Sequence, residues 1–207
     1  MSDTTWNDHY ASGHLPWDTG SPEPMLTAFI AAGRVAPTRM LEVGAGTGTN
    51  AIWLAERGFD VLGIDVSPLA VEAARTRLAG RAVRCRFETR DFLAEPTGEG
   101  PFDFVFDRGT FHVFDEPEQR ALFAERVAAV LAPGGRWLSL IGSTEGPPRE
   151  VGPPRRSARD IAAAIEPVLE IVELSTAEFA DGPVPFKAWV CLAGRRSTPA
   201  QPSSRRG

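Results

Sequence analysis

The chain has 207 residues, the size of a single α/β domain and enough to bury a substantial core. It carries 22 basic and 27 acidic side chains, a formal net charge of −5, which disfavours nonspecific binding to nucleic acid or to an anionic membrane surface. Two cysteines, Cys85 and Cys191, provide neither a disulfide framework nor a metal-binding cluster.

The N-terminal residues MSDTTWNDHY are polar and aromatic, which is not the pattern of a signal peptide. No apolar run approaches the ~20 residues of a membrane-spanning helix. We therefore expect a cytoplasmic protein with no membrane partner. Residues 1–194 are expected to form one domain, and residues 195–207, rich in Ser, Pro, Gly and Arg, a disordered tail.

Helical and strand-like patterns alternate after residue 22. Apolar spacing predicts helices over residues 24–35, 49–57, 68–78 and from 115 to 132. Strands are predicted over residues 39–43, 60–64, 82–87, 102–106 and 136–141. Ser67 is the expected N-cap of the third helix, and Asp115 with Glu118 forms an expected capping box for the fourth. Such alternation predicts a mainly parallel sheet with helices on both faces, an α/β fold.

The last third of the chain departs from this alternation. A Pro- and Gly-rich segment over residues 142–156 is too long for a routine connection, and long loops in compact domains are often functional. Ser157 and Asp160 form an expected capping box for a short helix to residue 165. Strands predicted over residues 168–174 and 186–192 have only a loop between them, which suits an antiparallel pair.

The most informative motif is LEVGAGTG over residues 41–48, a hydrophobic strand that breaks into glycines before a helix. Glycines let main-chain N–H groups approach a ligand closely, and the N-terminus of the following helix faces the same point. The next predicted strand leads into Asp65, which is placed to hold a ribose hydroxyl. The pattern predicts a site for a cofactor with an adenosine-like half.

The spacing of the glycines bears on which cofactor binds. The dinucleotide fingerprint G-x-G-x-x-G would place its third glycine at position 49, which is Thr49 here. A short-chain dehydrogenase would also need a Tyr-x-x-x-Lys pair, whereas Tyr10 and Lys187 are far apart in this chain. A nicotinamide-dependent oxidoreductase is therefore disfavoured.

Residues 6 to 194 resemble the class I S-adenosylmethionine-dependent methyltransferases. The resemblance rests on EVGAGTG (42–48), GIDVS (63–67), RDF (90–92), FDFVFDRGTFH (102–112) and LAPGGRWL (131–138), in that order and spacing. It implies a Rossmann-like, seven-stranded, mostly parallel sheet with an antiparallel last strand and helices on both faces. It also implies S-adenosyl-L-methionine as cofactor and S-adenosyl-L-homocysteine as product.

The resemblance assigns cofactor roles to the matching residues. Glu42 through Gly48 would line the methionine part, Asp65 would hold the ribose, and Asp107 would begin the loop beneath the sulfonium. The expected cofactor-binding residues are Trp17, Glu42, Gly44, Ala45, Gly46, Gly48, Asp65, Val66, Ser67, Asp91, Phe92 and Asp107, with Asp91 and Phe92 flanking the adenine. A non-catalytic cofactor-binding module is an alternative, disfavoured by the polar residues on the expected substrate face.

The segment after the fourth predicted strand bears on the methyl acceptor. Methyltransferases that act on adenine or glutamine amino groups carry an Asn/Asp-Pro-Pro-aromatic motif where this chain has Asp107-Arg108-Gly109-Thr110. Nucleic-acid and protein-amide acceptors are therefore disfavoured, and without an evident metal cluster a metal-dependent mechanism lacks support. We expect a small-molecule substrate and a monomer or homodimer.

The N-terminal segment over residues 1–22, with Pro-Trp-Asp at 16–18, looks like that of the thiopurine, thiol and halide methyltransferase branch, as does DRGTFH. In that branch the segment folds over the cofactor as a lid, and the Trp of Pro-Trp-Asp contacts the cofactor. Trp17 maps onto this position, where an aromatic face attracts a sulfonium by roughly 0.5–2 kcal/mol. Plain packing of Trp17 is the alternative.

His112 and Asp107 are the candidate catalytic residues. His112 follows the fourth predicted strand on the ligand side of an open α/β sheet, where it is either a proton acceptor or a structural histidine. An arginine of the long loop could hold a substrate anion, although a solvated basic loop is the alternative. The expected substrate-site residues are Trp6, Tyr10, His112, Arg155 and Arg156.

The chemistry of methyl transfer favours one acceptor class. A thiol is already partly ionised at neutral pH and needs little help from a base, whereas phenols and alcohols benefit more from one. We therefore expect S-methylation of a small thiol or selenol. O- or N-methylation of a secondary metabolite is the alternative.

Overall fold

A computed structural model of the protein describes residues 3–95, 97–147, 152–179 and 185–196. Seven strands form one sheet in the order β3-β2-β1-β4-β5-β7-β6, and β7 is antiparallel to both of its neighbours. This confirms the predicted sheet with an antiparallel last strand. The strands are β1 (Arg39–Val43), β2 (Asp60–Asp65), β3 (Cys85–Thr89), β4 (Phe102–Arg108), β5 (Leu131–Gly142), β6 (Glu170–Phe179) and β7 (Phe186–Gly194).

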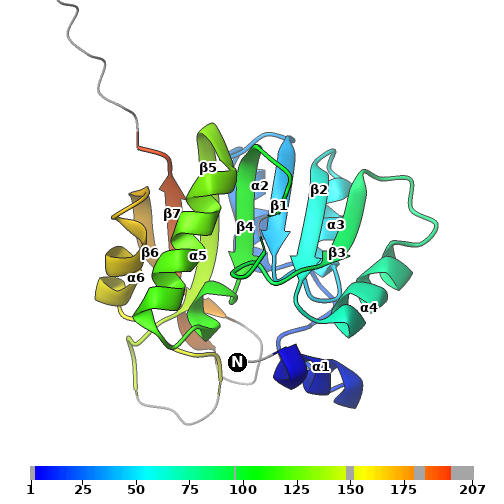
Figure 1. Cartoon of the computed structure of the whole chain (residues 1–207), viewed down its shortest axis with the longest axis horizontal. Helices are drawn as coiled ribbons and strands as arrows, with labels where there is room; N and C mark the ends of the chain where they lie inside the picture. The colour runs from blue at the N-terminus through cyan, green and yellow to red at the C-terminus, as the bar shows by residue number, and fades with distance from the viewer. Residues whose placement is uncertain (1–2, 96, 148–151, 180–184, 197–207) are drawn as a thin grey trace, which may run out of the picture.

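Helices cover both faces of this sheet, with α5 and α6 in front of it and α2 and α3 behind it in the view of Figure 1. The described part of the chain has no helix that is both long and apolar enough to cross a membrane. The helices are α1 (Asp3–Ser12), α2 (Pro24–Ala31), α3 (Thr49–Ala55), α4 (Pro68–Leu78), α5 (Pro117–Val130) and α6 (Ala158–Ile165), with a 3-10 turn, η1 (Phe111–Val113).

Two buried clusters hold these layers together, one on each face of the sheet. Because successive side chains of a strand point to opposite faces, the apolar run of β4 supplies both clusters. Phe104 and Phe106 join the cluster with α2, α3 and α4, whereas Val105 joins the cluster with α5 and α6. Fully burying each such side chain stabilises the fold by ~1.5–3 kcal/mol.

The N-cap and capping-box patterns in the sequence predicted two helix starts correctly and one incorrectly. Ser67 caps α4 by accepting from the Ala70 N–H at 3.3 Å, and Ser157 and Asp160 form the predicted capping box of α6. The capping box predicted at Asp115 is wrong, because α5 begins at Pro117 with no side-chain cap. Asp115 instead accepts from a guanidinium nitrogen of the loop before α6, 2.7 Å away.

The strand bounds differ most from prediction in the second half of the chain. β5 begins at Leu131 rather than at residue 136, because the Pro-Gly-Gly stretch at 133–135 passes through a register shift against β4 instead of a turn. β6 runs to Phe179 and so extends five residues beyond its predicted end at 174. Of the tail predicted to be disordered, residues 197–207 lie outside the described residues.

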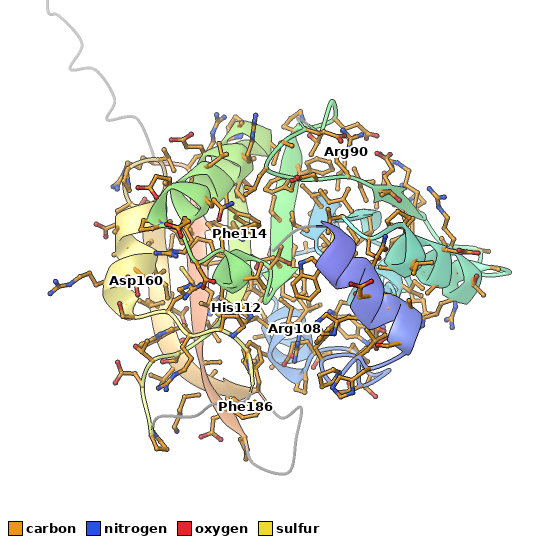
Figure 2. All side chains as sticks on the ribbon, turned by 60° about the horizontal axis from the view of Figure 1, so that its bottom comes forward. Arg90, Arg108, His112, Phe114, Asp160 and Phe186 are labelled. Atoms are coloured by element: carbon orange, nitrogen blue, oxygen red, sulfur yellow. The ribbon has the colours of Figure 1, made fainter. Side chains whose placement is uncertain are left out.

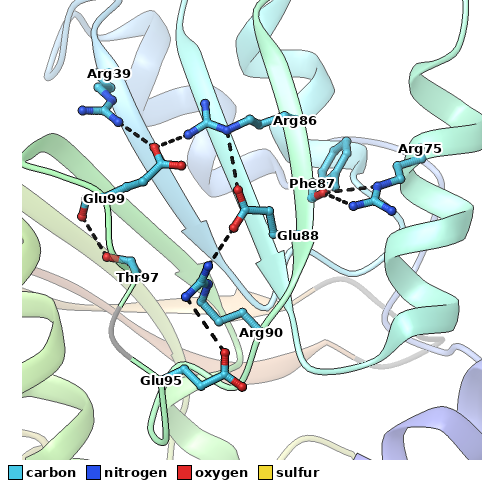
Figure 3. Close-up of polar contacts among 9 residues, drawn as sticks. All are labelled: Arg39, Arg75, Arg86, Phe87, Glu88, Arg90, Glu95, Thr97 and Glu99. Atoms are coloured by element: carbon cyan, nitrogen blue, oxygen red, sulfur yellow. Dashed lines mark hydrogen bonds and ion pairs between the residues drawn. The ribbon is translucent and has the colours of Figure 1, made fainter.

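The edge of the sheet at β3 carries a network of ion pairs, drawn in Figure 3. Glu99 accepts from both Arg39 and Arg86, and Glu88 lies 3.0 Å from a guanidinium nitrogen of Arg90. Exposed ion pairs add little stability. Charged side chains on an edge strand do, however, disfavour pairing with a strand of another molecule.

Candidate active site

The predicted motif residues meet at the carboxyl ends of the central parallel strands. Val43 at the end of β1 is in register with Ile64 of β2 and with Asp107 of β4, so the loops that follow all three strands lie side by side. In Figure 1, α1 lies below the arrowheads of β1, β2 and β4, at this same edge. Ligands of open α/β sheets bind in this place.

The glycine loop packs closely against side chains from two other parts of the chain. Gly44 and Gly46 have φ angles of 70° and 55°, which favour glycine. A Cβ on Gly44 would collide with the Thr110 side chain, whose Oγ1 donates to the Val43 carbonyl at 2.9 Å. A Cβ on Gly46 would lie 3.0 Å from the Tyr10 hydroxyl. The loop therefore has a side chain of the β4–α5 connection on one side and one of α1 on the other.

Glu42 presents a buried carboxyl group to this loop. Its side chain is 1% exposed, and Oε1 accepts from Asn50 Nδ2 at 3.3 Å. Oε2 is buried and has no hydrogen-bond partner among the described residues. Burial raises the pKa of Glu42 to about 8, although the Asn50 bond acts in the opposite direction. An unpartnered carboxyl oxygen beside the glycine loop fits the ammonium group of a methionine moiety, whose positive charge would favour ionisation of Glu42.

Asp65 ends β2 with an oriented carboxylate. Its Oδ2 accepts from the Gly46 N–H at 2.8 Å and its Oδ1 from the Ser67 N–H at 2.9 Å. Burial raises the pKa of Asp65, and these two bonds oppose the shift. Because a carboxylate has about four acceptor positions, capacity remains for the hydroxyls of a ribose. Val66 and Ser67 continue from Asp65 into the start of α4.

Residues 90–92 lie beside Asp65, because the Arg90 N–H donates to the Asp65 carbonyl at 2.8 Å. The Asp91 Oδ1 accepts from the main-chain N–H groups of Leu93 and Ala94 at 2.8 and 3.1 Å and so shapes the turn. Phe92 is buried and packs against Phe123, with 5.0 Å between ring centroids. The adenine site predicted for Asp91 and Phe92 stays a prediction, and the Phe92 ring packs into the core on the α5 side.

The N-terminal segment, which we predicted to be a lid, packs an aromatic cluster against the glycine loop. The ring centroids of Trp6, His9 and Tyr10 lie 5.6, 5.3 and 6.4 Å from that of Trp17. Burial, and then the charge of Asp65, raises the pKa of the Tyr10 phenol, so the hydroxyl keeps its proton at neutral pH. Trp6 and Tyr10, which we expected at the substrate site, thus belong to one cluster with Trp17 beside the predicted cofactor loop.

Asp107 is fully buried, and its carboxylate is engaged by the protein. Oδ1 accepts from the main-chain N–H groups of Thr110 and Phe111 at 3.2 and 3.0 Å, and Oδ2 accepts from Trp137 Nε1 at 2.8 Å. Burial raises the pKa of Asp107 to about 6. This geometry favours a role in shaping the loop after β4 over contact with an acceptor.

His112 is held by the main chain of β5. It is 4% exposed, and Nδ1 accepts from the Gly142 N–H at 2.7 Å. A ring nitrogen that accepts a hydrogen bond carries no hydrogen, so the bond from Gly142 to Nδ1 places the ring hydrogen on Nε2. With its hydrogen there, Nε2 cannot accept a proton, which disfavours His112 as the proton acceptor. Figure 2 shows His112 and Arg108 near the centre of this end of the molecule.

The two arginines of the long loop bind the protein itself. Arg155 donates through Nε to the Ser143 carbonyl at 2.9 Å, and its other nitrogens reach carbonyls of residues 144–147. Arg156 Nη2 reaches the Phe114 carbonyl at 3.0 Å and Asp115 at 2.7 Å. Both guanidinium groups organise the loop, so the geometry does not favour the predicted hold on a substrate anion.

One buried ion pair, between Arg108 and Glu23, is not predicted by any sequence pattern. Arg108 Nε lies 2.5 Å from Glu23 Oε2, and the two side chains are 15% and 5% exposed. The guanidinium also lies 4.7 Å from the centroid of the Phe179 ring, and the Glu23 N–H donates to Asn50 Oδ1 at 2.8 Å. The pair thus joins the start of α2 to the ends of β4 and β6. No local pattern could have revealed it, because its partners are 85 residues apart.

Comparison with known proteins identifies the family. A family model described as a methyltransferase domain matches residues 40–135. The chain is 33% identical over 152 residues to the probable thiol methyltransferase 2 of Arabidopsis thaliana, covering 70% of this chain and 66% of that protein. It is 29% identical over 150 residues to the thiopurine S-methyltransferase of Vibrio cholerae, covering 64% and 66%. The chain spans about half to two thirds of the length of the curated relatives it matches.

Solved structures agree over nearly the whole chain. One, from a study of the conversion of a disulfide bond into a thioacetal group during echinomycin biosynthesis, has a TM-score of 0.81 at 26% identity, covering 94% of this chain and 92% of that one. The 1,6-didemethyltoxoflavin-N1-methyltransferase of Burkholderia thailandensis, solved with S-adenosylhomocysteine, has a TM-score of 0.76 at 20% identity, covering 94% and 87%. The chain belongs to the class I S-adenosylmethionine-dependent methyltransferases, and S-adenosyl-L-methionine is its cofactor.

Proposed function

We propose that this protein transfers the methyl group of S-adenosylmethionine to the sulfur of a small thiol. The observation that carries the proposal is the state of the proton-accepting groups around the loop after β4. Among the residues that the structure describes, Asp107 accepts three hydrogen bonds, Glu23 is paired with Arg108, and His112 Nδ1 accepts from Gly142. A thiol has a pKa near 8.5, so it is partly ionised at neutral pH and reacts without such a base.

The relatives support a sulfur acceptor. The Arabidopsis and Vibrio proteins are named for thiol and thiopurine substrates, and the solved structure at 26% identity comes from a study of sulfur chemistry. Phenols and alcohols, by contrast, ionise far above neutral pH and gain more from a general base. Thiol methylation therefore fits both the described geometry and the relatives better than O-methylation does.

In this proposal the protein binds the cofactor, aligns the acceptor with it and excludes water from the site. When bound, the cofactor supplies an electrophilic methyl group on a sulfonium. Glu42 would hold the ammonium group, Asp65 the ribose hydroxyls, and the glycine loop would line the methionine part. The Trp17 cluster would cover the site and exclude water, while Asp107 fixes the loop on which the acceptor rests. Alignment and exclusion of water are the main contributions to an in-line displacement.

A panel of matched acceptors tests the proposal. Thiophenol, phenol and aniline share one ring and differ in the nucleophilic atom, and release of S-adenosylhomocysteine reports turnover for all three. We expect kcat/KM for thiophenol to exceed that for phenol and aniline by at least about tenfold, corresponding to about 1.4 kcal/mol in activation free energy. Preference for phenol or aniline would refute the thiol assignment and favour O- or N-methylation.

A further inference from the structure

Asp18, the residue after Trp17, connects the lid segment to the glycine loop. Its Oδ2 accepts from Thr47 Oγ1 at 2.5 Å, and its side chain is 15% exposed. Its Oδ1 accepts from the Gly20 N–H at 3.1 Å, which shapes the chain just beyond it. A carboxylate of the lid therefore contacts the centre of the predicted cofactor loop directly.

A second element places a positive charge near this carboxylate. Arg77 of α4 places Nη2 3.7 Å from Asp18 Oδ2, and its Nη1 donates to Thr49 Oγ1. Thr49 Oγ1 itself lies 3.5 Å from Asp18 Oδ1. Asp18, Thr47, Thr49 and Arg77, here named the Asp18 network, thus join the lid segment, the glycine loop with the start of α3, and α4. Hydrogen bonds to an ionised group are stronger than those between neutral groups.

The lid has another attachment at the opposite end of the site. Asn7 Oδ1 of α1 accepts from Ser67 Oγ at 2.5 Å, next to Asp65. The Asp18 network therefore lies at the glycine loop and the Asn7 contact at the predicted ribose end. Trp17 packs against Trp6, His9 and Tyr10 of α1 and is directly bonded to Asp18 in the chain. Its orientation depends on where Asp18 is held.

We propose that Asp18 is a positioning residue that latches the lid onto Thr47, keeps Trp17 over the cofactor and slows cofactor release. Its carboxylate acts through Thr47 and Trp17 and takes no part in bond making. The proposal rests on the proposed function only through the shared cofactor, not through the acceptor. Loss of the latch would raise the rate at which the lid opens and would leave the other cofactor contacts in place.

Binding of S-adenosylhomocysteine, measured by calorimetry and by stopped-flow dissociation, tests the latch without any acceptor. Asp18→Ala and Thr47→Val should each weaken binding by about tenfold, through faster dissociation. The double variant should be no weaker than either single one, because both remove the same interaction. Thr47→Ser, which keeps the hydroxyl, should restore wild-type dissociation. Asp8→Asn, at an exposed carboxylate of α1, is the control for lid charge and should match wild type.

Additive effects of Asp18→Ala and Thr47→Val, or an unchanged dissociation rate in either, would overturn the proposal. If Asp18→Ala does not fold, the comparison of Thr47→Val with Thr47→Ser decides. Dissociation of S-adenosylhomocysteine from Thr47→Val as slow as from Thr47→Ser would also overturn the proposal. Failure of the thiol assignment would show in the acceptor panel, whereas failure of the latch would show in dissociation rates alone. The two outcomes are therefore distinguishable.

Discussion

Replacing Glu42 by glutamine should stabilise the empty protein and weaken its binding of cofactor. Glu42 is fully buried, and its pKa is raised from 4.5 to about 8. As pH rises above 4.5 the unfolded chain ionises first, so wild-type stability falls until the folded carboxyl also ionises near pH 8. Each pH unit above 4.5 lowers the free energy of unfolding by about 1.4 kcal/mol, so the wild type loses about 3 kcal/mol by pH 7. A glutamine does not ionise and avoids this loss.

Urea denaturation at several pH values measures the effect. The free energy of unfolding of Glu42→Gln minus that of wild type should be below about 1 kcal/mol at pH 5 and about 3 kcal/mol at pH 7, growing further to pH 8.5. Glu118→Gln, at an exposed position of α5, is the matched control and should show no such trend. A difference that is the same at all three pH values would refute the reasoning about Glu42.

The same variant tests the role of Glu42 in binding. Its unpartnered Oε2 is the atom that we expect to accept from the ammonium group of the cofactor. The ammonium group would favour ionisation of Glu42, which a glutamine cannot undergo, so binding of S-adenosylhomocysteine should weaken by about tenfold or more. Binding as tight as in the wild type would show that the ammonium group lies elsewhere.

Three further substitutions separate binding, positioning and folding roles. Asp65→Ala should weaken S-adenosylhomocysteine binding, measured by calorimetry, by about 1–3 kcal/mol through loss of charged hydrogen bonds. An unchanged affinity would show that Asp65 does not contact the cofactor. His112→Ala should lower turnover more than cofactor affinity, and His112→Asn, which can again accept from Gly142, should recover it in rate assays with a thiol. Asp107→Asn should lower the free energy of unfolding, measured by urea denaturation, by about 1–3 kcal/mol, because an amide cannot accept from Trp137 and from both main-chain N–H groups together. A variant as stable as the wild type would contradict the described bonds.

The fold was largely predictable because its signals are local. Strand periodicity, the glycine loop and the capping box at Ser157 and Asp160 each depend on residues within a few positions of one another. The capping box predicted at Asp115 failed for the opposite reason. Its carboxylate is taken by Arg156, 41 residues further along the chain, and no local pattern reports such a partner.

The site was predictable in part, for a similar reason. The ends of β1, β2 and β4 bring the motif residues to one edge of the sheet, as the strand pattern predicts, whereas the binding roles of Glu42 and Asp65 stay predictions. The direction of a long side chain depends on the tertiary fold. Arg155 therefore turns to nearby carbonyls, and Arg108 finds Glu23, in ways that composition and spacing do not encode.

The central claim, methylation of a thiol without a base from the protein, is tested most directly by the pH dependence of kcat/KM for two thiols. The pair should differ in thiol pKa by about two units, for instance a thiophenol and an alkyl thiol. The account predicts that the rising limb follows the pKa of each thiol and shifts by about two units between them. The account would be contradicted if both thiols gave the same rising limb in the pH profile and His112→Asn shifted or abolished it. That result would show that a group of the protein takes the proton.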